Sequence, residues 1–246
     1  MAIHDAASQR LFVADDLSAG QDLILGDDQA HYLVHVLRMK PSAVVLVFNG
    51  RDGEWRATLA DVKKRSATLV VDCQVRPQVA GPDIAYLFAP LKRSRLDYMV
   101  QKATELGVAT LEPVLTRRTI AERVNLDRMR ANAIEAAEQC GVLRVPDVRA
   151  AMTLEQRLAT WDAGRSLIVC DESAKARDPI TALRQVPAGP LAVLVGPEGG
   201  FSPDEFERLA GLPEVYRISL GPRIMRADTA AVAALALVNA TLGDWT

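Results

Sequence analysis

The chain has 246 residues, of which 49% are hydrophobic and 24% are charged. This is enough to bury the core of one large domain or two small ones. The composition excludes a disordered chain, and 15 Gly with 13 Pro are too few for a collagen-like repeat. The formal net charge of -2 gives no evidence for a nucleic-acid partner.

Neither membrane insertion nor export is indicated by the sequence. The longest uninterrupted apolar run, residues 230–238, is too short to cross a bilayer. Residues 1–5 lack the basic patch and apolar stretch that open a signal peptide. The three cysteines, Cys73, Cys140 and Cys170, are widely spaced, which argues against a disulfide framework or a zinc knuckle. We therefore expect a soluble cytoplasmic protein without a membrane partner.

The first part of the chain, residues 1–75, is predicted to form a small β-barrel domain. A short helix is expected over 27–37, and apolar runs or alternating apolar and polar residues predict strands at 43–48, 54–59 and 66–73. His31 and His35 are four residues apart, but Tyr32 stands where a zinc protease has its Glu. We therefore expect no metal site.

After a linker near residues 76–82, strands alternate with helices. Apolar runs predict strands at 84–89, 110–115, 166–170, 191–195 and 215–220. The helix after the first strand is expected to begin at Ser94, with Asp97 as its capping partner. Such repeated units favour an α/β domain over residues 82–246, with a mainly parallel sheet covered on both faces.

The sharpest local feature is a glycine-rich turn after the strand at 191–195. Gly196-Pro197-Glu198-Gly199-Gly200 lacks Lys and Arg, and its spacing fits neither a dinucleotide fold nor a P-loop. Ser202, Pro203 and Glu205 then predict a helix start with a capping box. The turn is expected at the carboxyl end of a parallel strand, where α/β folds bind ligands. Because it carries Glu198 and neither Lys nor Arg, it favours a ligand with hydroxyls, an adenine or a positive centre. A tight structural turn is the alternative.

A second loop leads into an almost wholly apolar final helix at 230–242. This helix must be buried in the core or against a second subunit, and we expect Asp228 or Thr229 to cap it. Arg223 and Arg226 in the loop are costly to place without a partner, which indicates either a functional site or an ordinary ion pair.

Basic residues gather between positions 92 and 130. Lys92-Arg93-Ser94-Arg95 places three cations at a helix start, where they oppose the helix dipole, so a contact with phosphates is one explanation. Arg117-Arg118 and Lys63-Lys64-Arg65 are candidates of the same kind. A solvated surface is the alternative for each.

Five stretches in the expected order resemble motifs of the ribosomal RNA small subunit methyltransferase E family. Two of them are the loops described above, at 194–201 and 220–230. The other three are 31–41, then 102–108 with Pro113 and Arg118, and 135–139 with Val145-Pro146. The resemblance covers nearly the whole chain. This sequence differs from the family pattern at Met225 and Asp228, where the family more often has Leu and Glu.

The resemblance implies an N-terminal PUA-like β-barrel followed by a SPOUT domain, an α/β domain whose C-terminal part is tied in a trefoil knot. It also implies a homodimer. The implied reaction transfers a methyl group from S-adenosyl-L-methionine to N3 of one uridine near the 3′ end of 16S rRNA, within the small ribosomal subunit.

Carried over to the matching positions, the resemblance also implies site residues. The cofactor-binding candidates are Cys170, Leu194, Gly196, Pro197, Glu198, Gly200, Ile218, Leu220, Gly221, Ile224 and Met225. Arg226 is the candidate for stabilising the developing uracil anion, and Asp228 for accepting the N3 proton or orienting Arg226. The candidates for gripping RNA by its shape and phosphates are Arg38, Lys92, Arg93, Arg95 and Arg118.

Two other functions stay open from the sequence. One is a SPOUT methyltransferase that acts on another RNA, such as tRNA. The other is a non-catalytic RNA-binding protein, which would have no affinity for the cofactor. A nicotinamide enzyme is disfavoured because the dinucleotide glycine pattern is missing.

Overall fold

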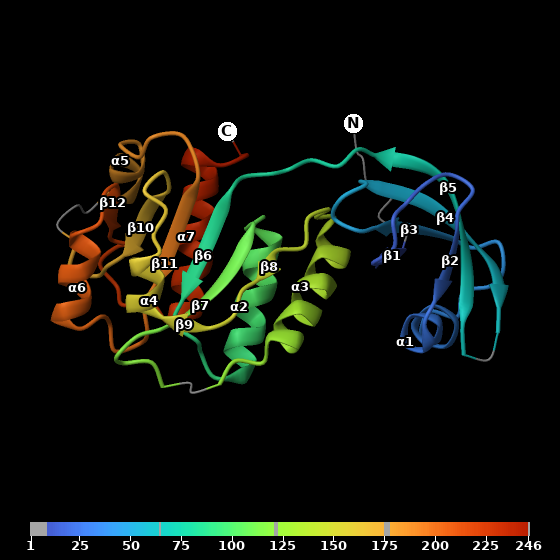
Figure 1. Cartoon of the computed structure of the whole chain (residues 1–246), viewed down its shortest axis with the longest axis horizontal. Coiled ribbons are helices and arrows are strands. Elements are labelled where there is room, and N and C mark those ends of the chain that lie inside the picture. The colour runs from blue at the N-terminus through green and yellow to red at the C-terminus, as the bar shows by residue number, and fades with distance from the viewer. Residues whose placement is uncertain (1–8, 64, 121–122, 175–177, 246) are drawn as a thin grey trace. The chain divides into compact units, whose positions relative to one another are not determined.

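The chain divides into two compact units (Figure 1). The computed structural model describes residues 9–63, 65–120, 123–174 and 178–245, so the predictions for Lys64 and for residues 1–5 lie outside the described residues. The first unit comprises residues 1–80 and 137–144, and the second comprises 81–136 and 145–246.

The first unit is built on a five-stranded sheet in the order β1-β3-β4-β5-β2. The pair β1–β3 is parallel and the other pairs are antiparallel. The strands are β1 (Gln9–Phe12), β2 (Asp22–Leu25), β3 (Val44–Phe48), β4 (Glu54–Val62) and β5 (Ala67–Arg76). The three predicted strands are confirmed. The edge strands β1 and β2 were missed because four residues are too few to establish an alternating pattern.

A short helical segment follows β2. Helix α1 (Asp27–His31) continues into one turn of π-helix (Tyr32–Val36) and ends before Arg38, which has a φ of 55°. Within this segment Ala30 and Leu33 are buried and pack into the core of the first unit. The predicted helix at 27–37 is thus confirmed, with its second turn wider than an α-helix.

Residues 137–144 belong to the first unit, which differs from the predicted boundaries. The guanidinium of Arg10 donates to the carbonyls of Glu138 (2.9 Å) and Val142 (3.1 Å), and Arg76 donates to that of Gly141 (2.9 Å). Both arginines also bind Glu54, which is 1% exposed. Backbone carbonyls carry no residue-specific signal, so the sequence could not reveal this attachment.

The second unit contains a wholly parallel sheet in the order β12-β10-β11-β6-β7-β8. The strands are β6 (Ile84–Phe88), β7 (Thr110–Leu115), β8 (Asp147–Val148), β10 (Ser166–Cys170), β11 (Leu191–Val195) and β12 (Val215–Ile218), with β9 (Met152–Thr153) beside β7. All five predicted strands are present. The last one ends at Ile218, two residues earlier than expected.

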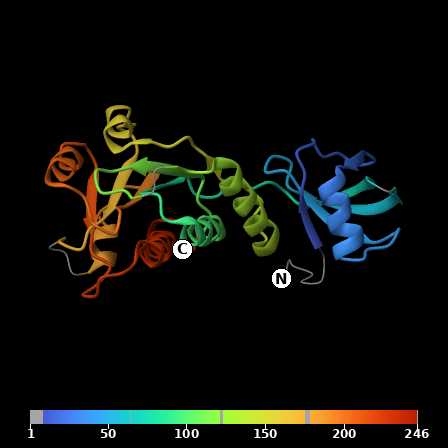
Figure 2. The ribbon, with the colours of Figure 1, turned by 90° about the horizontal axis from the view of Figure 1, so that it is seen from below.

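Helices cover both faces of this sheet, as its apolar strands require. They are α2 (Arg93–Glu105), α3 (Leu126–Cys140), α4 (Leu154–Ala159), α5 (Pro179–Leu183), α6 (Pro203–Ala210) and α7 (Ala227–Leu242). Figure 2 shows α2 beside α7 on one face, with α4 and α6 on the other. Consecutive residues of β11 pack into the cores on opposite faces of the sheet: Val193 packs with the α2–α7 layer, and Leu194 packs with the α4–α6 layer.

Three predicted helix starts have different outcomes. The capping box of α6 is confirmed, since Ser202 and Glu205 each accept the other's backbone N–H. The one predicted for α2 is wrong: the helix begins at Arg93, and Asp97 instead accepts hydrogen bonds from Arg128 and Asn132. Helix α7 starts at Ala227 rather than Ala230, and the Arg226 side chain makes no capping bond.

Candidate functional site

A pocket of about 280 Å³ lies where β10, β11 and β12 end. Three loops line it, with residues 170–173 after β10, 195–201 around the end of β11, and 220–221 with 223–225 after β12. Arg118, Phe206, Ala227 and Ala230 complete the lining. We call it the large pocket. Its position at the carboxyl ends of parallel strands is where α/β folds bind ligands.

The glycine-rich turn has a backbone that few other residues could adopt. Gly200 has a φ of 67°, and its N–H donates to the carbonyl of Pro197 at 2.9 Å. A Cβ on Gly196 would stand 2.8 Å from the ring of Phe201. The turn is therefore fixed by close packing against Phe201, and its residues 196–201 all line the large pocket.

One wall of the large pocket was not predicted. Asp171 is 6% exposed and lines the pocket directly after β10. Its carboxylate accepts hydrogen bonds from Ser173, at 2.8 Å, and from Arg217, whose guanidinium also lies over the ring of Phe206. Asp171 and Arg217 are distant in sequence and meet only because β10 and β12 are neighbours. An acidic residue directly after a buried strand was the only available signal.

Cys170 stands at the same strand end and is half-buried. Burial raises the pKa of its thiol to about 12, and the neighbouring Asp171 carboxylate adds to this effect. Burial also raises the pKa of Tyr86, helped by the negative charge of Asp228. Both groups are therefore neutral at physiological pH and act as apolar or hydrogen-bonding surface.

Most of the predicted cofactor residues come together at the large pocket. Cys170, Gly196, Pro197, Glu198, Gly200, Leu220, Gly221, Ile224 and Met225 all line it. Leu194 and Ile218 do not. Both residues have an exposed fraction of 0%, and their side chains pack into the two cores.

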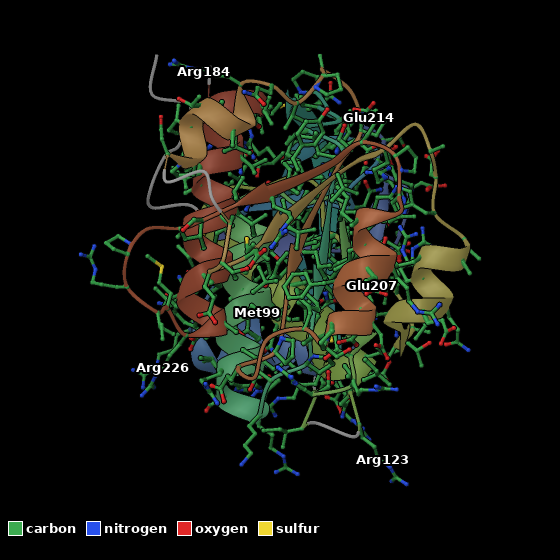
Figure 3. All side chains as sticks on the ribbon, turned by 90° about the vertical axis from the view of Figure 1, so that its left-hand side faces the viewer. Met99, Arg123, Arg184, Glu207, Glu214 and Arg226 are labelled. Atoms are coloured by element: carbon green, nitrogen blue, oxygen red, sulfur yellow. The ribbon has the colours of Figure 1, made fainter. Side chains whose placement is uncertain are left out.

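The two predicted catalytic residues flank the pocket without lining it. Arg226 is exposed between Met225 and Ala227, and Figure 3 places it at the same end of the second unit as Arg123, opposite Arg184 and Glu214. The Arg226 charge lowers the pKa of Glu198 further, after the larger effects of Arg95. Asp228 is half-buried in the first turn of α7.

A second pocket of about 30 Å³ lies beside the first, and we call it the small pocket. Lys92, Arg95 and Arg118 line it, together with Glu198. Arg95 forms an ion pair with Glu198, and Arg118 donates to the carbonyl of Gly199 at 2.6 Å. Three predicted RNA-binding residues thus converge here.

The other predicted cations are dispersed. Arg93 is exposed at the first position of α2, and Arg38 is exposed in the first unit. Arg117 pairs with Asp204 at 3.2 Å, and Arg65 pairs with Asp27 at 2.7 Å. Solvated ion pairs therefore account for these last two cations.

The described part of the chain holds no group of three or more His, Cys, Asp or Glu side chains suited to a metal ion. Within the same residues, no helix has the length and apolar character to cross a membrane.

Two protein families match this chain. Residues 80–239 match an RNA methyltransferase domain, and residues 25–72 match an RNA methyltransferase PUA domain. The α/β fold class with an N-terminal PUA-like domain is therefore confirmed. The first match includes every lining segment of the large pocket.

Relatives agree over nearly the whole chain. The ribosomal RNA small subunit methyltransferase E of Rickettsia conorii is 31% identical, over 94% of this chain and 94% of the relative. That of Synechocystis is 32% identical, over 95% of this chain and 78% of the relative.

Two solved structures are similar to this chain over nearly its whole length. The methyltransferase E of Neisseria gonorrhoeae, crystallised with S-adenosyl methionine, has a TM-score of 0.83 at 28% identity, covering 97% of this chain and 100% of that one. A Legionella pneumophila structure with bound cofactor SAM has a TM-score of 0.84 at 28% identity, covering 96% of this chain and 99% of that one. This chain belongs to the ribosomal RNA small subunit methyltransferase E family.

Proposed function

We propose that the protein transfers a methyl group from S-adenosyl-L-methionine to N3 of one uridine in 16S rRNA, within the small ribosomal subunit. The observation that carries the proposal is the large pocket at the carboxyl ends of three parallel strands, and two similar structures that hold S-adenosylmethionine support it. The relatives are ribosomal RNA small subunit methyltransferases, which favours ribosomal RNA of the small subunit over tRNA as the acceptor.

The donor set of the large pocket fits this cofactor. Its lining carries three carboxylates, Asp171, Glu172 and Glu198, against two arginines, Arg118 and Arg223, and among the described lining residues there is no lysine. Ile224, Met225 and the two phenylalanines supply apolar surface that suits an adenine. When bound, S-adenosylmethionine supplies a methyl group on a positively charged sulfur, and carboxylates attract this charge. The cofactor has no phosphate, so it needs no phosphate-binding cations.

In the reaction, the protein positions the uracil and accepts the proton from its N3. The bond from N3 to the methyl carbon forms as the sulfur–methyl bond breaks, and the N3 proton leaves to a base. We assign Arg226 to the negative charge that develops on the uracil, since its side chain is exposed beside the pocket. Asp228 is the proposed proton acceptor or the residue that orients Arg226.

The proposed RNA contacts are Arg38, Lys92, Arg93, Arg95 and Arg118. Because N3 lies on the pairing edge of uracil, the target base must be unpaired or turned out of its stack. We also propose a homodimer in the cytoplasm. It is supported by α7, where Val232, Ala233 and Ala236 are apolar and only half-buried.

The test is the transfer of labelled methyl from S-adenosylmethionine to three acceptors: small subunits that lack the modification, naked 16S rRNA, and tRNA. We expect label only in 16S rRNA, recovered as 3-methyluridine. Label in tRNA would overturn the substrate while keeping the enzyme class. Absence of both label and cofactor binding would leave a non-catalytic RNA-binding protein.

A further inference from the structure

Glu198 is the one carboxylate, among the residues that the structure describes, that lines both the large and the small pocket. On the large-pocket side it stands with Asp171 and Glu172. On the small-pocket side it faces the cations Lys92, Arg95 and Arg118. Its charge can therefore serve either a cationic ligand in the large pocket or the cations of the small one.

In this structure the negative charge of Glu198 is paired with the positive charge of Arg95. The two side chains form an ion pair, and the hydrogen bond from Arg95 holds the pKa of Glu198 below its usual range. The Glu198 carboxylate is thus ionised, but the positive charge of Arg95 offsets most of its negative charge. The side chains are 28% and 45% exposed, and ion pairs as exposed as this one are weak, so another anion can displace Glu198 from Arg95.

We propose that Arg95 is a positioning residue that acts through Glu198. When a phosphate of the RNA enters the small pocket and binds Arg95, Glu198 is released and presents its charge to the large pocket. This inference rests on the proposed function, because it takes the ligand of the small pocket to be RNA and that of the large pocket to be S-adenosylmethionine.

The arrangement has two thermodynamic consequences. RNA and S-adenosylmethionine bind with positive coupling, and the coupling is the same whichever binds first. The coupling is also specific for charge: it favours the positively charged sulfonium of the cofactor over the neutral thioether of the product, S-adenosylhomocysteine. Reaction therefore weakens the contact to Glu198 and helps to release the product.

The experiment measures the Kd of S-adenosylmethionine and of S-adenosylhomocysteine by calorimetry, with and without a short single-stranded uridine RNA. We expect the RNA to tighten S-adenosylmethionine binding about two- to fivefold and to leave S-adenosylhomocysteine binding nearly unchanged. A third arm replaces the RNA with inorganic phosphate at the same phosphate concentration. An equal effect of phosphate alone would overturn RNA as the ligand.

Two variants separate this role from a merely structural one. In Arg95→Ala, Glu198 loses its partner, so S-adenosylmethionine should bind about two- to fivefold more tightly without RNA, and S-adenosylhomocysteine should not. In Glu198→Gln, RNA should no longer tighten S-adenosylmethionine binding, so the variant should bind the cofactor more weakly than wild type when RNA is present. If Arg95→Ala weakens the binding of both ligands, Arg95 only supports the loop and the proposal is wrong.

The matched control is Arg130→Ala. Arg130 is an exposed arginine that pairs with Asp127 at 2.9 Å and lines neither pocket. It should leave the coupling as in the wild type. The labelled-methyl assay is independent of these binding measurements. Methyl transfer without coupling between RNA and S-adenosylmethionine overturns the role of Arg95 alone, whereas failure of transfer overturns the proposed function.

Discussion

Arg226 is the residue whose loss most directly tests the chemistry. Its backbone carbonyl accepts the N–H of Ala230 and so starts α7, but its side chain makes no hydrogen bond or ion pair among the described residues. Arg226→Ala should therefore leave folding intact and lower kcat about a hundredfold or more. The readouts are kcat for labelled methyl transfer and the calorimetric Kd of S-adenosylmethionine, which should stay nearly unchanged. Loss of cofactor binding would instead make Arg226 a structural residue.

The cysteines give a residue-scale prediction about pH. The thiolate is the form of cysteine that attacks alkylating reagents, and the raised pKa of about 12 keeps the Cys170 thiol neutral. Cys73 is exposed, so iodoacetamide should label it at about pH 8 while Cys170 stays unlabelled. Mass spectrometry of the labelled peptides measures both rates. Equal rates would contradict the burial of Cys170.

The same thiol affects stability in alkali. Its pKa is higher in the folded chain than in the unfolded one, so its contribution to stability is complete below about pH 9 and is lost as pH rises toward 12. In urea titrations, wild type should lose stability over this window more steeply than Cys170→Ala.

At the scale of elements, the α6 capping box links helix stability to the pocket. Ser202 accepts the N–H of Glu205, whose carboxylate accepts the N–H groups of Ser202 and of Arg117. Ser202→Ala should lower the free energy of unfolding by about 1 kcal/mol, measured by urea titration. Because Ser202 directly follows the glycine-rich turn, we also expect weaker S-adenosylmethionine binding.

The matched control for Ser202→Ala is Thr153→Ala. Thr153 caps α4 through an equivalent capping box with Gln156, and neither residue lines the large pocket. It should cost a similar free energy of unfolding without changing the cofactor Kd. If both variants weaken cofactor binding equally, the effect comes from general destabilisation and not from the turn.

These elements also mark what the sequence could reveal. The strands of the parallel sheet were predictable because each is a continuous apolar run, and the turn because glycines and a capping box are local signals. The predicted capping role of Asp97 failed because Arg128, 31 residues later, binds the same carboxylate. Asp171 was missed for the same reason, since its partner Arg217 comes from a neighbouring strand. Local patterns cannot show side chains that meet only after the sheet has formed.

At the scale of the whole molecule, the largest gap in the prediction is the attachment of residues 137–144 to the first unit. A buried Glu54 holds Arg10 at 2.6 Å and Arg76 at 2.8 Å, and these arginines bind the carbonyls of the distant segment. Burial lowers the pKa of Arg10, an effect that the hydrogen bond to Glu54 opposes. The trefoil knot that the family resemblance implies stays a prediction, because chain threading leaves no mark in the sequence.

Removing the charge of Glu54 should therefore have a large effect. Glu54→Gln keeps the shape of the side chain but removes the carboxylate that pairs with the buried guanidinium of Arg10 and the partly buried one of Arg76, which should cost about 3–5 kcal/mol of unfolding free energy. Urea titration measures this loss, and limited proteolysis should show faster cleavage within residues 137–144.

Asp72→Asn provides the comparison, because it removes a carboxylate from the same sheet in an exposed setting. Asp72 lies 3.6 Å from Arg56 across β4 and β5, and both side chains are at least a third exposed. Solvent screens such a pair, so its loss should cost less than about 1 kcal/mol. A similar cost for the two variants would mean that water reaches Glu54, and that the attachment of 137–144 rests on the backbone carbonyls and not on the buried charge.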